Sequence, residues 1–354
     1  MSIPRIEEDI RRIFPYPGIL SDRGMRREIR NGNITISDFK DSQLQPSSLD
    51  LRIGKVHLFD EAYRREEARR LARLPSEEII RYEPSDNPSI IFKDVEDSPI
   101  DLPPRSFAQI FFHENIKSNF PTRIDLRSSR GRLGLEILSS DNESVSVFNH
   151  NPNIIRLYGR TSFAQMFFTP SNAIDGYVVH NIDEAERIGR ALRIPTTGPY
   201  AVLSLGDHAY RFKHTGLTDT RNLKDTDCEK LSTKNLAIPI NETTICQLSP
   251  RIDLPADIGI QILHNIPFIQ NPGHYHPDPS HFLMEGHVCN AGWVDPGYKG
   301  NLTAHIRRTK TPGEYTKGEP LALGVFFKYH EPVERPYSPD RNHYYASDGT
   351  TARD

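Results

Sequence analysis

Short apolar runs separated by polar turns recur along the chain. Leu49, Leu51 and Ile53 alternate with Asp50 and Arg52, which is the period of a strand that buries one face. Comparable runs, several of them rich in phenylalanine or isoleucine, lie at 107–112, 145–148, 161–169 and 200–212. Together with 28 prolines, this pattern predicts a mostly β fold with many turns.

Helical patterns are few. A capped helix is predicted over 21–31, because Ser21 or Asp22 can accept hydrogen bonds at its start and Gly32 can end it. Further helices are predicted at 61–74, which is rich in Arg, Glu, Ala and Leu, and at 183–192.

Two sequence echoes indicate an internal duplication. Ile124-Asp125-Leu126 returns as Ile252-Asp253-Leu254, and the run 159–168 returns, in the same order, as 318–327. Two copies of one β domain would produce such matches. The predicted organisation is a first half over 1–170, a connector with a short helix and a strand over 171–235, and a second half over 236–354.

Composition narrows the class of protein. The 354 residues suffice for two domains with cores of their own. A formal net charge of -3 provides no basic field to attract nucleic acid or a membrane. The three cysteines lie far apart in the sequence, which suits a reducing compartment. Without a signal-type N-terminus or a run of membrane length, we expect a soluble, cytoplasmic protein with neither nucleic acid nor membrane as partner.

The densest chemistry lies in Arg127-Ser128-Ser129-Arg130-Gly131-Arg132-Leu133-Gly134-Leu135. Guanidinium groups match pairs of phosphate oxygens, hydroxyl groups fill the remaining directions, and glycines let backbone N–H groups approach an anion. The stretch therefore indicates a phosphate site. A solvated basic turn between two strands is the alternative that these residues leave open.

A second stretch, Asp295-Pro296-Gly297-Tyr298, has the composition of a tight turn. It predicts either a plain hairpin or a functional turn. In a functional turn Asp295 would hold a water or a sugar hydroxyl, and Tyr298 would offer a flat surface to a sugar or a base.

Histidines gather in one proline-rich segment. His274, His276 and His281 could ligate a metal, or they could belong to a surface loop that binds none.

Taken together, these motifs resemble the dCTP deaminase branch of the dCTP deaminase/dUTPase superfamily. The resemblance is carried by Ile19 to Arg23, Gln45 to Arg52, Arg127 to Leu135, Val294 to Gly300 and Pro336-Tyr337, in the family's order. The long, duplicated layout is similar to the double-length deaminases of some bacteria.

The resemblance implies a fold and a chemistry. It implies duplicated, distorted jelly-roll β-barrels, usually assembled as a homo-oligomer, often a trimer. Magnesium would bind through the nucleotide triphosphate, and the base would be deaminated without a metal. The sequence agrees with the latter point, since it lacks the zinc deaminase signature.

It also implies roles for individual residues. Arg127, Ser128 and Ser129 would hold phosphates, and Arg132 would lie near the reacting base. Asp295 would hold the deoxyribose or orient a water, Tyr298 would pack on the sugar, and Tyr337 would lie in a closing tail.

The chain departs from the family at three positions. The glutamate that acts as general base ten residues after the turn aspartate is replaced by His305, and by Val147 on the corresponding strand of the first half. The lysine expected in the tail falls on Tyr344. His305 could shuttle protons, because an imidazole titrates near neutral pH, or it could be a structural histidine on a strand. The motifs are divided between the halves, which predicts one composite site.

The predicted function is dCTP deamination, in which dCTP and water give dUTP and ammonia. One alternative is hydrolysis of dUTP to dUMP and pyrophosphate. Another is a non-catalytic nucleotide-binding or regulatory protein that has lost its general base.

Overall fold

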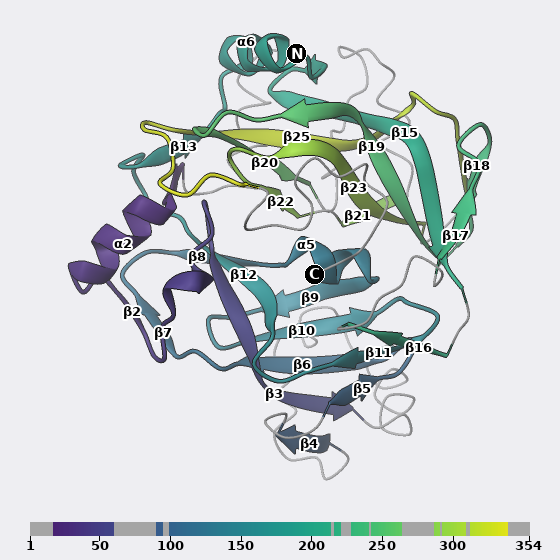
Figure 1. Cartoon of the computed structure of the whole chain (residues 1–354), viewed down its shortest axis with the longest axis horizontal. Helices are drawn as coiled ribbons and strands as arrows, with labels where there is room; N and C mark the ends of the chain where they lie inside the picture. The colour runs from purple at the N-terminus through teal and green to yellow at the C-terminus, as the bar shows by residue number, and fades with distance from the viewer. Residues whose placement is uncertain are drawn as a thin grey trace, which may run out of the picture.

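The computed structural model describes residues 17–59, 90–94, 99–213, 216–220, 228–240, 242–263, 287–290, 292–308 and 312–338. Within these ranges the chain is mostly β, as its pattern predicts. Its strands form two large sheets. In Figure 1 one occupies the lower part of the molecule and the other the upper part.

The lower sheet has seven strands in the part of the chain that the structure describes. They are β3 (Leu49–Phe59), β4 (Ile90–Asp94), β6 (Phe107–Phe112), β8 (Thr122–Leu126), β9 (Leu135–Ser140), β10 (Ser144–Asn149) and β12 (Ser162–Phe168). Their order is β8-β12-β3-β6-β10-β9, with β4 paired to β3, and every pair is antiparallel.

The upper sheet has eleven strands among the described residues. They are β1 (Gly18–Ile19), β13 (Gly176–Val178), β14 (Thr196–Thr197), β15 (Tyr200–Phe212), β17 (Cys228–Leu231), β19 (Thr243–Asp253), β20 (Ile258–Ile262), β21 (His287–Asn290), β22 (Trp293–Val294), β23 (Lys299–Arg308) and β25 (Pro320–Tyr329). The main path is β1-β13-β25-β15-β19-β23-β21, and β20 pairs with both β25 and β22.

Smaller elements complete the fold. Three small sheets pair β2 (Ile34–Ile36) with β7 (Ile116–Ser118), β11 (Ile154–Leu157) with β5 (Ile100–Leu102) and β16 (Leu217–Asp219), and β18 (Leu236–Ile238) with β24 (Gly313–Tyr315). The described helices are α2 (Asp22–Arg30), α5 (Ser128–Arg132), α6 (Ile182–Leu192) and the 3₁₀ turn η1 (Asp41–Gln43).

The strand order confirms the predicted duplication. The path β20-β25-β15-β19-β23-β21 repeats β8-β12-β3-β6-β10-β9 strand for strand. In addition, β17 pairs with β15 as β4 pairs with β3, and β18 pairs with β24 as β5 pairs with β11. The chain therefore folds as a duplicated β-barrel unit of jelly-roll type.

The strand order supports one of the two repeated sequence segments and contradicts the other. The echo between 159–168 and 318–327 is confirmed, because β12 and β25 occupy equivalent places. The other is wrong: Ile252-Asp253-Leu254 lies at the end of β19, whereas the counterpart of β8 is β20. The predicted connector contributes β15, which occupies the place of β3. The boundaries at 170 and 235 stay predictions.

Local patterns predicted several elements well. In α2 the Ser21 side chain accepts a hydrogen bond from Gly24 N at 3.1 Å, and Gly32 follows the helix with φ +75°. Helix α6 is also confirmed, with Asn181 as its cap. The helix predicted at 61–74 lies outside the described residues.

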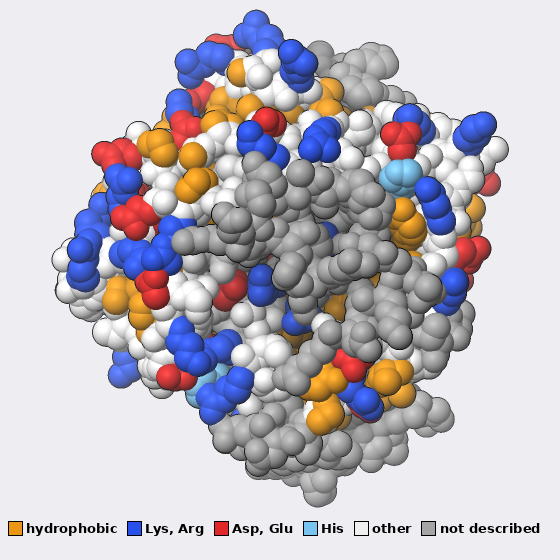
Figure 2. Space-filling model, in the orientation of Figure 1, with side chains coloured by type: hydrophobic (Ala, Val, Ile, Leu, Met, Phe, Trp, Pro, Cys, Tyr) orange, Lys and Arg blue, Asp and Glu red, His pale blue; other side chains and the backbone are white. Residues whose placement is uncertain are grey.

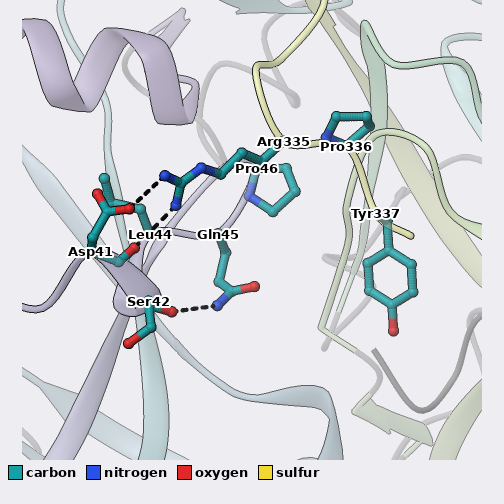
Figure 3. Close-up of a pocket in the computed structure, with 8 residues that line it drawn as sticks. All are labelled: Asp41, Ser42, Leu44, Gln45, Pro46, Arg335, Pro336 and Tyr337. Carbon is teal, nitrogen blue, oxygen red and sulfur yellow. Dashed lines mark hydrogen bonds and ion pairs between the residues drawn. The ribbon is translucent and has the colours of Figure 1, made fainter. Parts of the chain in front are cut away.

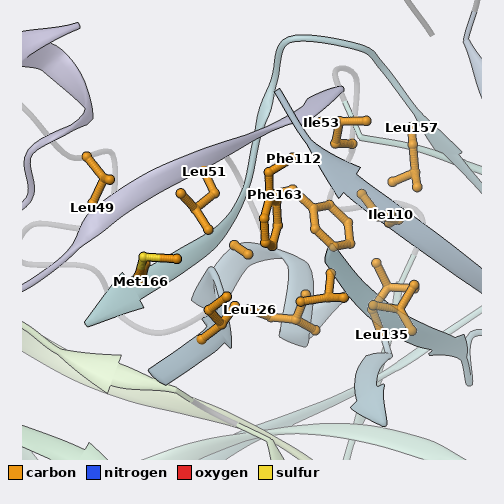
Figure 4. Packing of buried hydrophobic residues seen from close by; sticks show 14 of the residues in the cluster. Leu49, Leu51, Ile53, Ile110, Phe112, Leu126, Leu135, Leu157, Phe163 and Met166 are labelled. Atoms are coloured by element: carbon orange, nitrogen blue, oxygen red, sulfur yellow. The ribbon is translucent and has the colours of Figure 1, made fainter. Parts of the chain in front are cut away.

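Each half has its own hydrophobic core, and a third cluster joins the two. Figure 4 shows the first core, in which Leu51, Phe163 and Met166 meet from neighbouring strands. In the third cluster the Trp293 ring lies 4.6 Å from Phe167 of β12 and 4.2 Å from Phe327 of β25. Apolar contact thus fixes the two halves against each other, which matters because the candidate site draws on both.

The surface carries mixed charge. Figure 2 shows Lys and Arg side chains interspersed with Asp and Glu over the described part of this face. Among the described helices, none combines the length and the apolar character needed to cross a membrane.

Candidate active site

The arginine–serine stretch forms a short helix, α5, between β8 and β9. Arg130 N and Gly131 N donate to the carbonyl oxygen of Arg127 at 2.9 and 3.0 Å. Gly134 ends this segment with φ +89°, where an added Cβ would lie 3.1 Å from Asn151 N, so the position requires glycine. Because Arg130 and Arg132 are buried, the solvated-turn alternative is wrong for these two side chains.

Arg132 connects this helix to the second half of the chain. Its Nη1 donates to Thr303 Oγ1 on β23 at 2.9 Å, and its Nε donates to the Ser128 carbonyl at 3.1 Å. The guanidinium is therefore held at a fixed place between α5 and β23. In Figure 1, α5 and β9 lie at the level where the two sheets face each other.

A second connection runs from Arg127 to buried carboxyl groups. Arg127 Nη1 lies 3.5 Å from Asp50 Oδ2, which also accepts from Gln45 Nε2 at 3.1 Å. Burial raises the pKa of Asp50, and Arg127 opposes that rise. Sequence reasoning placed Asp50 only on the polar face of a strand. Its side chain is in fact buried, because Gln165 of β12 also covers this face.

Asp295 lies in the same buried region. Burial, followed by the negative charge of Asp50, raises the pKa of Asp295 to about 7, while Ser47 and Arg127 oppose the rise. Its Oδ1 is buried without a hydrogen-bond partner among the described residues. At neutral pH the carboxyl group therefore exchanges readily between its protonated and ionised forms.

The turn predicted at Asp295 to Tyr298 is confirmed. Tyr298 N donates to the Asp295 carbonyl at 3.2 Å, and Gly297 has φ +85°. Tyr298 OH donates to the Asn301 carbonyl at 2.6 Å, and the Tyr298 ring packs edge-on against Tyr337 with centroids 5.3 Å apart. The turn and the final described segment, which the resemblance implies as a closing tail, thus lie together.

A pocket of about 460 Å³ opens beside this region (Figure 3). It is lined by Asp41, Ser42, Leu44, Gln45, Pro46, Arg335, Pro336 and Tyr337. Gln45 joins the pocket to Asp50, and Tyr337 joins it to Tyr298. The ion pair between Arg335 and Asp41 holds the final segment against η1.

His305 lies on β23, two residues from Thr303, and is 3% exposed. Burial, together with the nearby His150 and Arg307, lowers the pKa of His305 to about 3. This shift favours the structural histidine of the two alternatives, because the protonated ring would be buried beside the Arg307 guanidinium. Its Nε2 has no hydrogen-bond partner among the described residues.

The structure thus brings most of the predicted residues together at one junction between the halves. Arg127 pairs with Asp50 near Asp295, and Arg132 bonds Thr303, two residues before His305 on β23. Tyr298 and Tyr337 contact each other. Ser128 and Ser129 lie on α5 itself. His274, His276, His281 and Tyr344 lie outside the described residues.

Comparisons with known proteins agree with the fold. A family model described as dCTP deaminase-like matches residues 19–171. The crystal structure of 2'-deoxycytidine 5'-triphosphate deaminase from Agrobacterium tumefaciens superposes with a TM-score of 0.66, covering 90% of this chain and 100% of that chain at 17% identity. At that identity the match shows a common fold.

Curated relatives match part of the first half. The dUMP-forming dCTP deaminase of Methanothermobacter thermautotrophicus is 39% identical over 122 residues, which are 33% of this chain and 56% of that protein. The dUMP-forming dCTP deaminase of Streptomyces coelicolor is 33% identical over 122 residues, with the same shares. The chain thus spans about half the length of the curated relatives it matches.

Residues 19–171 thus match the dCTP deaminase-like family model, and the curated relatives that match the chain are dCTP deaminases. The family predicted from the motifs is confirmed.

Proposed function

We propose that this protein deaminates dCTP with release of ammonia, at one site between α5 of the first half and β23 of the second. The observation that carries the proposal is the contact between Arg132 and Thr303. It brings the arginine–serine helix, which lies inside the family-matched stretch, against the strand that follows the Asp295 turn. The phosphate ligands of α5 and the carboxyl group of Asp295 then lie at the same junction between the two halves.

The side chains suit a pyrimidine deoxynucleotide. Ser128 and Ser129 hydroxyls and the Arg127 guanidinium are ligands for phosphate oxygens. Arg132, which donates a hydrogen bond to Thr303 on β23, would stabilise negative charge that develops on the base. Tyr298 and Tyr337, which lie in ring contact, would border the sugar.

Magnesium would enter with the nucleotide. The guanidinium groups of α5 are ligands for anions and cannot bind a cation. We therefore propose that the triphosphate itself holds the ion, which would neutralise phosphate charge. The homo-oligomer that the resemblance implies, often a trimer, also stays a prediction.

Whether the protein also hydrolyses the triphosphate is separate from whether it deaminates the base. The two relatives compared above are named dUMP-forming, which favours a second candidate activity, hydrolysis of the triphosphate to dUMP and pyrophosphate. Asp295 supports this candidate, because a carboxyl group with a pKa of about 7 can accept a proton from water at neutral pH.

Product analysis tests both activities. Purified protein is incubated with Mg²⁺ and either dCTP or dUTP, and ammonia, dUTP, dUMP and pyrophosphate are quantified. We expect ammonia from dCTP in amounts equal to the uracil nucleotide formed. Arg132→Ala should reduce the rate by about 10²–10³-fold, the usual effect of losing one preorganised charge-stabilising donor. Arg156→Ala is the control, since Arg156 pairs with Asp101 on the small sheet of β5 and β11.

Each outcome assigns the protein to one class. Ammonia with dUTP supports simple deamination, and ammonia with dUMP and pyrophosphate supports the two-step reaction. Pyrophosphate from dUTP, with dCTP unchanged, would make the protein a dUTP hydrolase. If both nucleotides remain unchanged but dCTP still raises the melting temperature, the protein is a nucleotide binder and the catalytic proposal fails.

A further inference from the structure

One face of β23 carries a row of polar side chains against the first half of the chain. Thr303, His305 and Arg307 alternate along the strand and therefore point to the same side. Thr303 receives the hydrogen bond from Arg132, and Arg307 Nη2 lies 2.6 Å from Glu136 Oε2. His305 lies between these two contacts along the strand.

Glu136 is held from two directions. Its Oε2 accepts from Arg307 on β23 and lies 2.6 Å from Nε2 of His150, which follows β10 directly. The His150 ring in turn packs on Phe148 with centroids 4.4 Å apart, and Phe148 is the cross-strand partner of Glu136. The carboxylate is thus oriented by groups from both halves.

The surroundings are buried, but the carboxylate is reachable. His150, His305 and Arg307 are each less than 9% exposed, whereas the Glu136 side chain is 22% exposed. Nδ1 of His150 and Nε2 of His305 are buried without a hydrogen-bond partner among the described residues. Two unpartnered ring nitrogens beside one carboxylate are unusual in a packed interior, and they offer hydrogen-bond positions to a bound molecule.

Charge keeps Glu136 ionised. Burial tends to raise the pKa of Glu136, but the hydrogen bond with His150 and the charge of Arg307 outweigh it, so the pKa lies below its usual value. His150 itself has a lowered pKa, mainly through burial. His305 is neutral, as shown above. Glu136 is therefore the proton acceptor in this group that carries a negative charge at neutral pH.

We propose that Glu136 accepts the proton of the attacking water during cytosine deamination, in the role for which the family resemblance expects a glutamate at position 305. His150 and Arg307 act as positioning residues that orient its carboxylate. This inference rests on the deamination proposed above. It explains how position 305 can hold a histidine, because the carboxylate comes from β9 of the other half.

The proton steps balance without a redox partner. Glu136 takes a proton from water while the water oxygen bonds to C4 of cytosine, and N3 receives that proton from Glu136. The resulting intermediate bears OH and NH₂ on C4. Glu136 then moves the hydroxyl proton to the amino nitrogen, the C4–N bond breaks, and ammonia leaves a uracil carbonyl behind. Arg132 and Thr303 lie at the other end of the row, where the base would be held.

The test compares Glu136→Gln with the wild type in the presence of dCTP and Mg²⁺. Gln keeps the size and one acceptor oxygen but cannot take up the proton. We expect kcat for ammonia release to fall about 10²–10⁴-fold, the usual range for a general base, while dCTP still raises the melting temperature. Asp101→Asn is the matched control, because it neutralises another carboxylate that is hydrogen-bonded to an arginine, Arg156, on the small sheet of β5 and β11.

A second variant tests the positioning role. Arg307→Gln removes the charge that lowers the pKa of Glu136. The activity should then require a higher pH, so the acid limb of the kcat profile moves upward, a shift that a merely structural ion pair would not produce. Among the described residues, the titratable and charged groups that face this carboxylate are His150, His305 and Arg307, and Arg105 acts on both His150 and Arg307.

The outcomes separate this proposal from the deamination itself. If the wild type releases no ammonia, both fail. If the wild type releases ammonia and Glu136→Gln does so within about threefold of it, only the role of Glu136 fails. If Glu136→Gln loses protection by dCTP together with activity, the role of Glu136 also fails, because the side chain then maintains the site rather than moving a proton.

Discussion

The pKa of Asp295 leads to a prediction about stability. In the folded protein burial and the charge of Asp50 raise this pKa from 3.8 to about 7. A carboxyl group whose pKa is higher in the folded state binds protons more tightly when folded. It therefore stabilises the fold at low pH, and this contribution is lost as the pH rises through the folded-state pKa. Asp295→Asn replaces the group with a neutral one of the same shape and should remove this pH dependence.

The magnitude follows from the two pKa values. Each pH unit between them corresponds to about 1.4 kcal/mol, so the full contribution of Asp295 is about 4 kcal/mol. Since the folded-state pKa is about 7, about 3 kcal/mol of it is lost between pH 5 and pH 8. Relative to the wild type, Asp295→Asn should therefore be more stable at pH 8 than at pH 5 by about that amount.

Urea unfolding at the two pH values provides the assay. Trp293 is the single tryptophan of the chain, and it is buried at the junction of the halves, so its fluorescence reports on the region around Asp295. The control is Asp253→Asn, which makes the same change at an exposed aspartate paired with Lys299. For this control we expect the difference between the two pH values to stay within about 0.5 kcal/mol.

Parallel pH profiles for the wild type and Asp295→Asn would refute the reasoning. Such a result would mean that Asp295 titrates near its ordinary value in the folded protein and is solvated. It would also remove the argument that this carboxyl group can accept a proton at neutral pH.

Three further predictions concern caps, buried charge and the nucleotide. Ser21→Ala should lower the free energy of unfolding by about 1 kcal/mol, because the first turn of α2 loses its side-chain acceptor; Ser21→Thr should lose less, and equal losses in urea unfolding would contradict the capping role. Glu114→Ala should destabilise by roughly 3–5 kcal/mol, because it leaves the buried Arg52 without its buried carboxylate partner; a loss below about 1 kcal/mol would show that Arg52 is solvated. Chelating Mg²⁺ with EDTA should slow dCTP turnover and leave the melting temperature of the nucleotide-free protein unchanged; a large drop in that temperature would instead indicate a metal bound by the protein.

Much of the secondary structure follows from local sequence. Alternation within 49–53 and the apolar run 200–212 predict β3 and β15, and a serine and a glycine mark the two ends of α2. These predictions succeed because a strand period, a cap and a glycine with positive φ depend on neighbouring residues only. The family motifs are short and local as well, which is why they identified the family without the fold.

The burial and the pKa of site residues could not be predicted from the sequence, because they depend on contacts between distant segments. The alternation placed Asp50 on a polar face, yet neighbouring strands bury it. The order of residues left open whether His305 titrates near neutral pH, and its surroundings lower its pKa to about 3. A pKa depends on burial and on charges from other elements, so neither property can be read from the order of residues.

By itself, then, the sequence determined the strands, the caps, the tight turn at Asp295 and the family. Tertiary structure alone decided which half supplies each part of the candidate site. Arg132 meets Thr303, and Glu136 meets Arg307, across 171 positions in each case. These pairs exist because the two copies of the β unit pack α5 and β9 of one against β23 of the other. That packing depends on burying apolar surface across the junction at Trp293. Contacts between residues so far apart in the chain leave no periodic pattern in the sequence, so the sequence does not predict them.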